Sequence, residues 1–175
     1  MIVGILGIIF VTCVIIFLTI SFYITIFGGG PFVPTPMDAV HKVLKEAGIK
    51  KGQKIYDIGA GDGRFLHFAE KDYGAISTGF EVDPFVFLIA KIRQIFWKWK
   101  GKIIFGSFFK QNFSKADIIF CYMLPRTMKK FHKTIMAGLK KKTKIVSYTF
   151  QIPDLKPSRI IPKKGKISKI FIYEI

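Results

Sequence analysis

The sequence has few acidic residues, few histidines and almost no cysteine. Asp and Glu number 11 against 28 Lys and Arg in 175 residues, so the formal net charge is +17. The two cysteines, Cys13 and Cys121, exclude a disulfide framework and a zinc site made of cysteines. The three histidines, His41, His67 and His132, lack metal-ligand spacing, and we expect no metal site. A chain of this length can hold one folded domain with a hydrophobic core.

Charge is missing altogether between Ile2 and Phe27, and every Lys and Arg lies at or beyond Lys42. At about 1.5 Å per residue this run would form a helix of roughly 39 Å, longer than a hydrocarbon core of about 30 Å. A signal peptide needs a basic start and a shorter apolar stretch, and a buried core helix is seldom uncharged for so long. We therefore predict a single transmembrane helix at residues 2–27, with the basic remainder in the cytoplasm.

Glycines and prolines separate this apolar run from the rest of the chain. They are concentrated in residues 28–34, which we predict to be a linker. A folded domain is predicted for residues 35–175. Its first helix is expected to have Thr35 as its N-cap, to carry Pro36 at the first helical position and to stop at Gly48.

Short apolar runs then alternate with stretches of helical periodicity. The predicted strands are residues 54–59, 75–82, 102–109, 116–123 and 144–150, and residues 158–175 predict a terminal antiparallel hairpin. This alternation is typical of an α/β fold with a doubly wound, mostly parallel sheet and helices on both faces. A helix capped by Asp83 is expected to turn one apolar face to the core: Phe85, Leu88, Ile89, Ile92, Ile95, Phe96 and Trp99.

A glycine-rich turn follows the first predicted strand, with glycines at positions 59, 61 and 63. Glycine lets the backbone turn sharply and approach a ligand closely. Glu81 ends the next predicted strand, where an acid can accept hydrogen bonds from the ribose hydroxyls of an adenosine. Together the turn and the acid predict a cofactor that contains adenosine, bound at the carboxyl ends of the strands.

The side chains of the turn distinguish between two such cofactors. The dinucleotide motif needs a third glycine where this chain has Arg64. Asp57 and Asp62 would repel a pyrophosphate, but they suit the ammonium and sulfonium groups of S-adenosylmethionine. The sequence therefore favours S-adenosylmethionine, with NAD as the alternative.

The segment IYDIGAGDGR followed by GFEVDP resembles motif I and the next acidic motif of the seven-strand methyltransferases. The preceding PFVPTP, and the LP that follows the fourth predicted strand, are similar to a family of protein-lysine methyltransferases. That family includes membrane-anchored enzymes acting on the c subunit of ATP synthase and archaeal enzymes of broad specificity. The resemblance covers roughly residues 32–157. It implies a Rossmann-like methyltransferase fold and S-adenosylmethionine as cofactor.

The resemblance also implies roles for individual residues of the cofactor site. Gly59, Ala60, Gly61 and Gly63 would form the cofactor loop. Asp57 and Asp62 would lie near the methionine part, Thr35 near its carboxylate, and Glu81 at the ribose. Val82 is also expected to contact the cofactor. Relatives often hold the adenine amino group with an acid or amide after the third strand. This chain has Ser107 there, so stacking on Phe108 is expected instead.

Three residues are predicted to serve methyl transfer. Phe32 and Tyr122 would form an aromatic channel that desolvates a lysine amine and so favours its neutral form. Asp117, which opens the fourth strand as in relatives, would take up the proton. The predicted function is methylation of lysine in a protein at or in the membrane. The alternative is a membrane-anchored module that binds S-adenosylmethionine or NAD without transferring a methyl group.

The excess of basic residues predicts a partner of its own. Basic and aromatic residues alternate at the end of the fourth predicted helix, where Lys91, Arg93, Lys98 and Lys100 interleave with Trp97 and Trp99. Beside a membrane span this patch suits anionic lipid. A solvated helix face is the alternative, and nucleic acid is disfavoured because of the predicted span.

Overall fold

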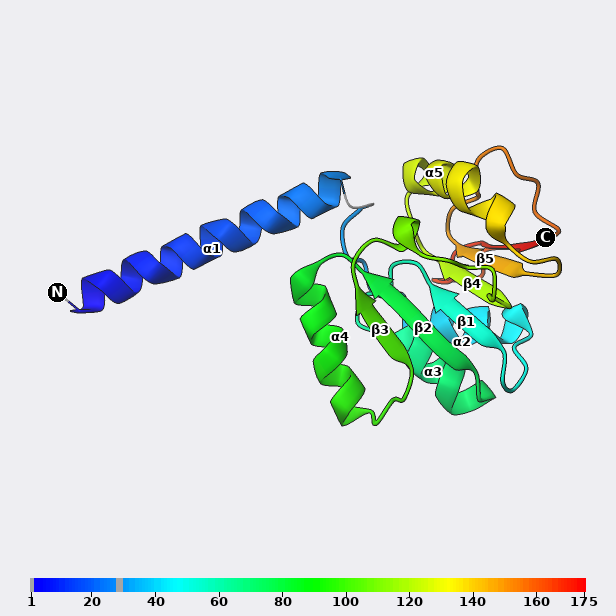
Figure 1. Cartoon of the computed structure of the whole chain (residues 1–175), viewed down its shortest axis with the longest axis horizontal. Coiled ribbons are helices and arrows are strands. Elements are labelled where there is room, and N and C mark those ends of the chain that lie inside the picture. Colours follow the sequence, from blue (N-terminus) through cyan, green and yellow to red (C-terminus); the bar gives the residue numbers. More distant parts are fainter. Residues whose placement is uncertain (1, 28–29) are drawn as a thin grey trace.

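The computed structural model describes residues 2–27 and 30–175 (Figure 1). Helix α1, Ile2–Phe27, projects away from a single α/β domain. The window Ile2–Ile24 has a mean hydropathy of 3.0 and none of it is buried, so α1 is long and apolar enough to cross a membrane. Two residues of the predicted linker, Gly28 and Gly29, lie outside the described residues. The rest of that linker has no regular structure.

Over the described residues the sheet has seven strands in the order β3-β2-β1-β4-β5-β7-β6. The parallel strands are β1 Lys54–Asp57, β2 Ile76–Glu81, β3 Lys102–Phe105, β4 Ile118–Cys121 and β5 Lys144–Tyr148. The antiparallel strands are β6 Arg159–Ile161 and β7 Ile170–Glu174. The mostly parallel sheet and the terminal hairpin are confirmed.

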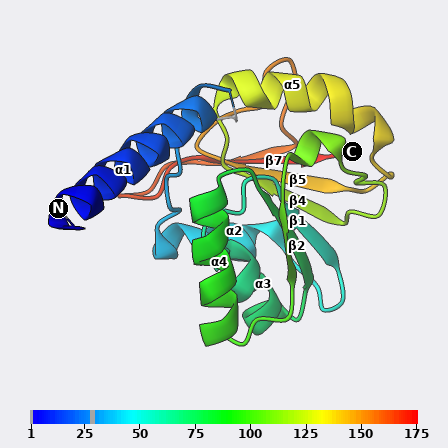
Figure 2. The ribbon, with the colours of Figure 1, turned by 60° about the vertical axis from the view of Figure 1, so that its left-hand side comes forward.

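Helices cover both faces of the sheet (Figure 2). One face carries α2 Met37–Ala47, α3 Arg64–Tyr73 and α4 Pro84–Phe96. The other carries α5 Pro125–Ile135 and the short 3-10 turns η1 Phe108–Lys110 and η2 Met136–Gly138.

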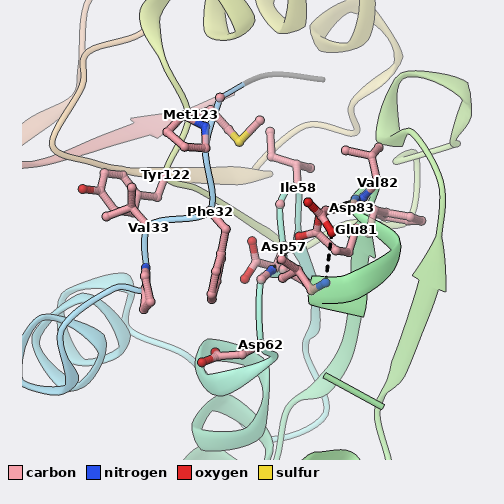
Figure 3. Close-up of a pocket in the computed structure, with 18 of the residues that line it drawn as sticks. Phe32, Val33, Asp57, Ile58, Asp62, Glu81, Val82, Asp83, Tyr122 and Met123 are labelled. Carbon is pink, nitrogen blue, oxygen red and sulfur yellow. Dashed lines mark hydrogen bonds between the residues drawn. The ribbon is translucent and has the colours of Figure 1, made fainter. Parts of the chain in front are cut away.

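The strand order reverses between β1 and β4, the place where parallel sheets bind ligands. Polar and aromatic side chains gather there, at the carboxyl ends of the strands (Figure 3).

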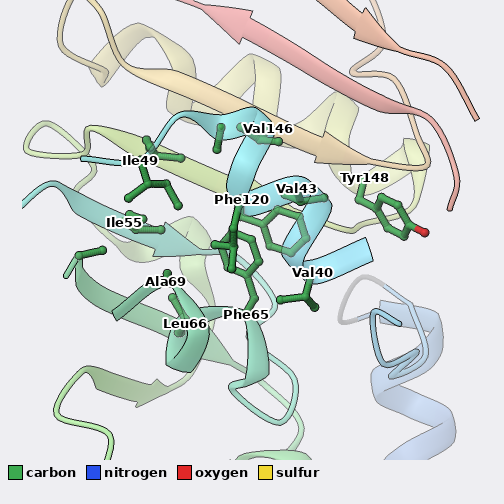
Figure 4. Close-up of a cluster of buried hydrophobic side chains, with 14 of the residues drawn as sticks. Val40, Val43, Ile49, Ile55, Phe65, Leu66, Ala69, Phe120, Val146 and Tyr148 are labelled. Atoms are coloured by element: carbon green, nitrogen blue, oxygen red, sulfur yellow. The ribbon is translucent and has the colours of Figure 1, made fainter. Parts of the chain in front are cut away.

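Two apolar clusters fill the space between the sheet and its helical layers. The first cluster includes Val43 of α2, Leu66 of α3 and Val146 of β5, and the rings of Phe65 and Phe120 stack with 3.9 Å between centroids (Figure 4). The second cluster lies under α5 and includes Ile119, Met128, Phe131 and Ile145. The ring pair of Phe65 and Phe120 joins α3 to β4.

The helix-capping predictions are confirmed at two of three positions. The Asp83 side chain accepts hydrogen bonds from the N–H groups of Phe85 and Val86, as an N-cap does. Gly48 ends α2 with a left-handed φ of 64°. The prediction that Thr35 caps α2 is wrong, because the helix begins at Met37 and Pro36 occupies the N-cap position. Pro36 has an extended ψ of 144° in place of a helical one, so the helix starts one residue later than predicted.

The predicted inward face of α4 is also wrong. Leu88 is 56% exposed and Phe96 79% exposed, while Val86 and Ala90 form the buried side of the helix. Of the predicted core-facing set only Trp99, beyond the helix end, is buried. The helix lies over β2 and the edge strand β3, where small side chains permit a close approach. The wider apolar face is therefore turned away from the sheet.

Candidate functional site

A cavity of about 480 Å³ opens at the carboxyl ends of β1, β2 and β4. Its walls come from the segment before α2, the turn after β1, the ends of β2, β3 and β4, and the first turns of α4. All the predicted site residues line it except Gly63 and Asp117. The cavity has the size and mixed polar and apolar walls of a small-molecule site.

The turn after β1 is built from glycines because other residues would not fit there. Gly61 has a left-handed φ of 57°, and a Cβ on it would lie 2.6 Å from the ring of Phe32. Gly59 has a φ of 143°, and a Cβ there would lie 2.9 Å from the sulfur of Met123. Gly63 lies just outside the cavity as the N-cap of α3. The turn thus brings bare backbone to the cavity wall.

Glu81 supports this turn from the end of β2. Its Oε2 accepts a hydrogen bond from Gly61 N–H at 2.9 Å, drawn as a dashed line in Figure 3. Its Oε1 accepts from Val82 N–H at 2.8 Å and from Asp83 N–H at 2.9 Å. Burial raises the pKa of Glu81, and the three backbone donors partly offset this. The carboxylate therefore fixes the turn, and a carboxylate with about four acceptor sites keeps room for a ligand hydroxyl.

Asp57 is the polar group in the cavity that lacks a partner among the described residues. Its side chain is 2% exposed, and Oδ1 is buried without a hydrogen bond. Burial raises the pKa of Asp57 well above its usual value, and the nearby charges of Glu81 and Asp62 raise it further. A buried carboxylate without a partner is costly, so this oxygen marks where a cationic or donor group of a ligand would be held.

Asp62 lines the same cavity, but its charge is already compensated. Arg64 donates to it through Nε at 2.9 Å and 3.0 Å, and Arg93 from α4 forms an ion pair with it. Arg64 also donates to the carbonyl oxygen of Thr35 at 3.0 Å. Arg64 thus ties the segment before α2 to the glycine turn, and Arg93 ties α4 to it. Of the two predicted acids, only Asp57 is free to compensate a ligand cation.

The predicted adenine end of the site is less polar. Ser107 lines the cavity, and its Oγ accepts a hydrogen bond from Phe109 N–H at 3.3 Å. The neighbouring Phe108 ring is buried and packs on Phe109, with 4.1 Å between centroids. Val82 adds an apolar wall beside them. Phe108 and Val82 therefore make this end of the cavity largely apolar.

Aromatic side chains form the opposite wall. Phe32 points into the cavity between Tyr122 and Asp62 in Figure 3, and it is 42% exposed. The Tyr122 ring packs edge-on against Tyr148, with 5.0 Å between centroids, and stacks with Phe150. The structure therefore brings Phe32 and Tyr122 together, as the predicted channel requires.

Asp117 lies outside the cavity. It precedes β4, so it is at the amino end of that strand, whereas the cavity is at the carboxyl end. Its carboxylate accepts from Lys54 N–H at 2.7 Å and pairs with Lys140. Burial alone would raise the pKa of Asp117, but these two partners hold it below its usual value. This position contradicts the prediction that Asp117 takes up the proton of the acceptor.

Several apolar residues of the cavity wall were not predicted from the sequence, and four of them come from two helices. Phe17 and Ile24 come from α1, and Phe85 and Ile89 come from the exposed face of α4. The rings of Phe17 and Phe85 meet edge to face, with 4.5 Å between centroids. No motif marks such residues, because an apolar helical face looks the same in sequence whether it faces a core or a cavity.

Comparison with known proteins decides the family. A model of the ANTKMT methyltransferase domain matches residues 57–159. The chain belongs to this methyltransferase family. A protein-lysine N-methyltransferase of Saccharolobus islandicus is 28% identical over 134 residues, which cover 75% of this methyltransferase and 83% of that protein. The human lysine N-methyltransferase named for the C subunit of ATP synthase is 25% identical over 134 residues, 74% of this chain but only 56% of the human protein.

A solved structure supports the same assignment. The RNA methyltransferase of Salinibacter ruber, in complex with S-adenosyl-L-homocysteine, matches with a TM-score of 0.77 at 27% identity. The match covers 82% of this chain and 94% of that one. The cofactor of this methyltransferase is accordingly S-adenosylmethionine, and the NAD alternative is not supported.

The residues of the cavity fit that cofactor. Asp57, whose buried Oδ1 lacks a partner, would hold the ammonium group, and Glu81 would hold the ribose. Bare backbone at Gly59 and Gly61 would let the methionine part approach without a clash. Phe108 and Val82 would supply apolar surface for the adenine.

Proposed function

We propose that this methyltransferase transfers methyl groups from S-adenosylmethionine to lysine side chains of a protein at or in a membrane, to which α1 anchors it. The observation that carries the proposal is the single cavity that joins an unpartnered acid, Asp57, to the aromatic pair Phe32 and Tyr122. The names of the relatives support a lysine acceptor. The bare apolar surface of α1 supports the anchor.

The bound cofactor supplies a methyl group on a sulfonium: the lysine nitrogen lone pair forms the new C–N bond as the C–S bond breaks and its electrons pass to sulfur. The protein has to align the amine on this axis and exclude water. A lysine amine has a pKa near 10.4 and must first be neutral. Phe32 and Tyr122 provide apolar walls that disfavour the charged form, so that the proton leaves to water.

The membrane arrangement follows from the distribution of charge. Every Lys and Arg lies on the domain side of α1, so we propose that α1 spans the bilayer once and leaves residues 35–175 in the cytoplasm. The exposed Lys91, Lys98 and Lys100 would then face anionic headgroups.

Trp97 and Trp99 do not belong to that surface. Trp97 packs on His67, and buried Trp99 donates to the hydroxyl of Ser77.

The acceptor can be tested by incubating the purified full-length protein with methyl-labelled S-adenosylmethionine, host membranes and host RNA. We expect label on lysine side chains of membrane proteins, mapped by mass spectrometry. The Gly61→Ala variant, whose new Cβ would collide with Phe32, is the matched control and should label nothing. Label confined to RNA or lipid would refute the lysine acceptor and leave the methyltransferase fold and cofactor intact.

The anchor can be tested by deleting residues 2–27. The polar contacts proposed for the cofactor all lie beyond Thr35, so the shortened protein should bind S-adenosylmethionine and methylate a free peptide. Methylation of a membrane-embedded substrate should fall by about 100-fold, because confinement to one surface raises the effective concentration. If the shortened protein instead loses cofactor binding while the full chain in detergent retains it, α1 is part of the folded core.

A further inference from the structure

The outward face of α4 is apolar along its whole length. Six exposed side chains form what we call the α4 patch: Phe85, Leu88, Ile89, Ile92, Ile95 and Phe96. At about 100° per residue these positions fall within an arc of roughly 120° on the helix surface. Phe105 at the end of edge strand β3 is also exposed, at 55%, and its ring centroid lies 5.4 Å from that of Phe87 on a flank of α4 outside the patch. Such a continuous apolar surface marks an interaction site.

The margins of the α4 patch are basic. Lys91 and Arg93 lie on either side of the apolar arc, and Lys98 and Lys100 follow the end of the helix. Arg93 is partly used by its ion pair with Asp62, whereas the three lysines are exposed. An apolar stripe with basic margins is typical of helices that lie in the interface of an anionic bilayer.

The position of α1 shows which way the α4 patch faces. Both views of the ribbon place α1 and α4 on the same side of the domain, and α4 runs across the direction in which α1 projects (Figures 1 and 2). The ring contact of Phe17 with Phe85 joins the surface of α1 to the first turn of α4. If α1 follows the bilayer normal, α4 therefore lies in the plane of the membrane surface.

We infer that the α4 patch inserts into the headgroup and upper acyl region of the bilayer and holds the domain against the membrane. Burial of apolar side chains that otherwise face water favours this insertion. The inference rests on the proposed anchor and adds an orientation to it. Phe85 and Ile89 belong to both the patch and the cavity wall, so insertion sets the cavity opening at the level of the headgroups. The acceptor is then a lysine presented at that depth.

The inference can be tested on the full-length protein in vesicles of phosphatidylcholine and phosphatidylglycerol. In a Cys13→Ser background, a nitroxide is attached at Ile92→Cys, Ile160→Cys or Ile9→Cys, one site at a time. Cys121 stays unlabelled because it is buried and its thiol has a pKa raised to about 12. Ile160, on edge strand β6 at the far end of the sheet, is the matched control, since it is 50% exposed and Ile92 46% exposed.

We expect the label at Ile92 to become several-fold less accessible to a water-soluble nickel chelate than the label at Ile160, and more accessible to oxygen. The inference would be overturned, and the anchor left standing, if the label at Ile92 were as accessible to the nickel chelate as the label at Ile160 while the label at Ile9 was protected by lipid. Full accessibility to the chelate at all three sites would refute the anchor as well. Spin–spin broadening at Ile92 would show that a second copy covers the patch, and would overturn the inference too.

Discussion

Glu81→Ala should weaken S-adenosylmethionine binding at least about 100-fold, or roughly 2.7 kcal/mol. The substitution removes the acceptor of three backbone hydrogen bonds and leaves the N–H groups of Gly61, Val82 and Asp83 without their partner. Hydrogen bonds to a charged group contribute about 1.5–3 kcal/mol each. The variant should therefore lose both the shape of the glycine turn and the carboxylate that would bind the ribose. Titration calorimetry measures the change.

Two controls make this result specific. Glu174→Ala removes an exposed acid on β7, far from the cavity, and should bind the cofactor like the unaltered protein. Thermal unfolding monitored by circular dichroism should show that Glu81→Ala still unfolds cooperatively. Undiminished binding by a folded Glu81→Ala variant would mean that the cofactor does not occupy this cavity.

Asp57→Asn should have opposite effects on binding and on stability. Because burial raises the pKa of Asp57, ionising it costs free energy in the ligand-free protein. The protonated acid contributes its full stability at a pH below the pKa that Asp57 has in the unfolded chain. This contribution is lost as the pH rises through the higher pKa that Asp57 has in the folded protein. At higher pH the neutral Asn should therefore be more stable than Asp57, and a gain of about 1 kcal/mol raises Tm by roughly 2–4 °C.

The affinity of Asp57→Asn for the cofactor should fall, although its stability rises. The ammonium group needs the ionised carboxylate, so Asp57→Asn should reduce affinity by at least about tenfold, or roughly 1.4 kcal/mol. In the unaltered protein, affinity should fall as pH falls through the raised pKa of Asp57, and the variant should lack this dependence. Equal affinity in both proteins across the pH range would refute the role of Asp57.

Local patterns in the sequence were sufficient to predict most of the polar residues that line the cavity. The alternation of strands and helices placed the glycine turn at the switch point of the sheet, and a turn there must lie at a ligand site. Glu81 was predictable because the end of the neighbouring parallel strand lies at the same edge. Phe32 and Tyr122 came from the family resemblance, and the fold brings them to one cavity.

The errors concern partners that are distant in sequence. The compensation of Asp62 by Arg93 depends on how α4 packs, and no local pattern shows it. Asp117 was misplaced because the family resemblance was followed although the residue opens the fourth strand, at its amino end, whereas the cavity lies at the carboxyl ends. The outward apolar face of α4 could not be predicted, because helical periodicity shows that a face is apolar but not what covers it.

The central claim is that this methyltransferase modifies protein lysine at a membrane, and the most direct measurement is made in its host. The gene is deleted, and methylated lysines of the membrane proteins are quantified by mass spectrometry. We predict that one or more methyl-lysines disappear, return with the unaltered protein and stay absent with Glu81→Ala. Unchanged lysine methylation, together with loss of a methyl group from RNA or lipid, would contradict the account.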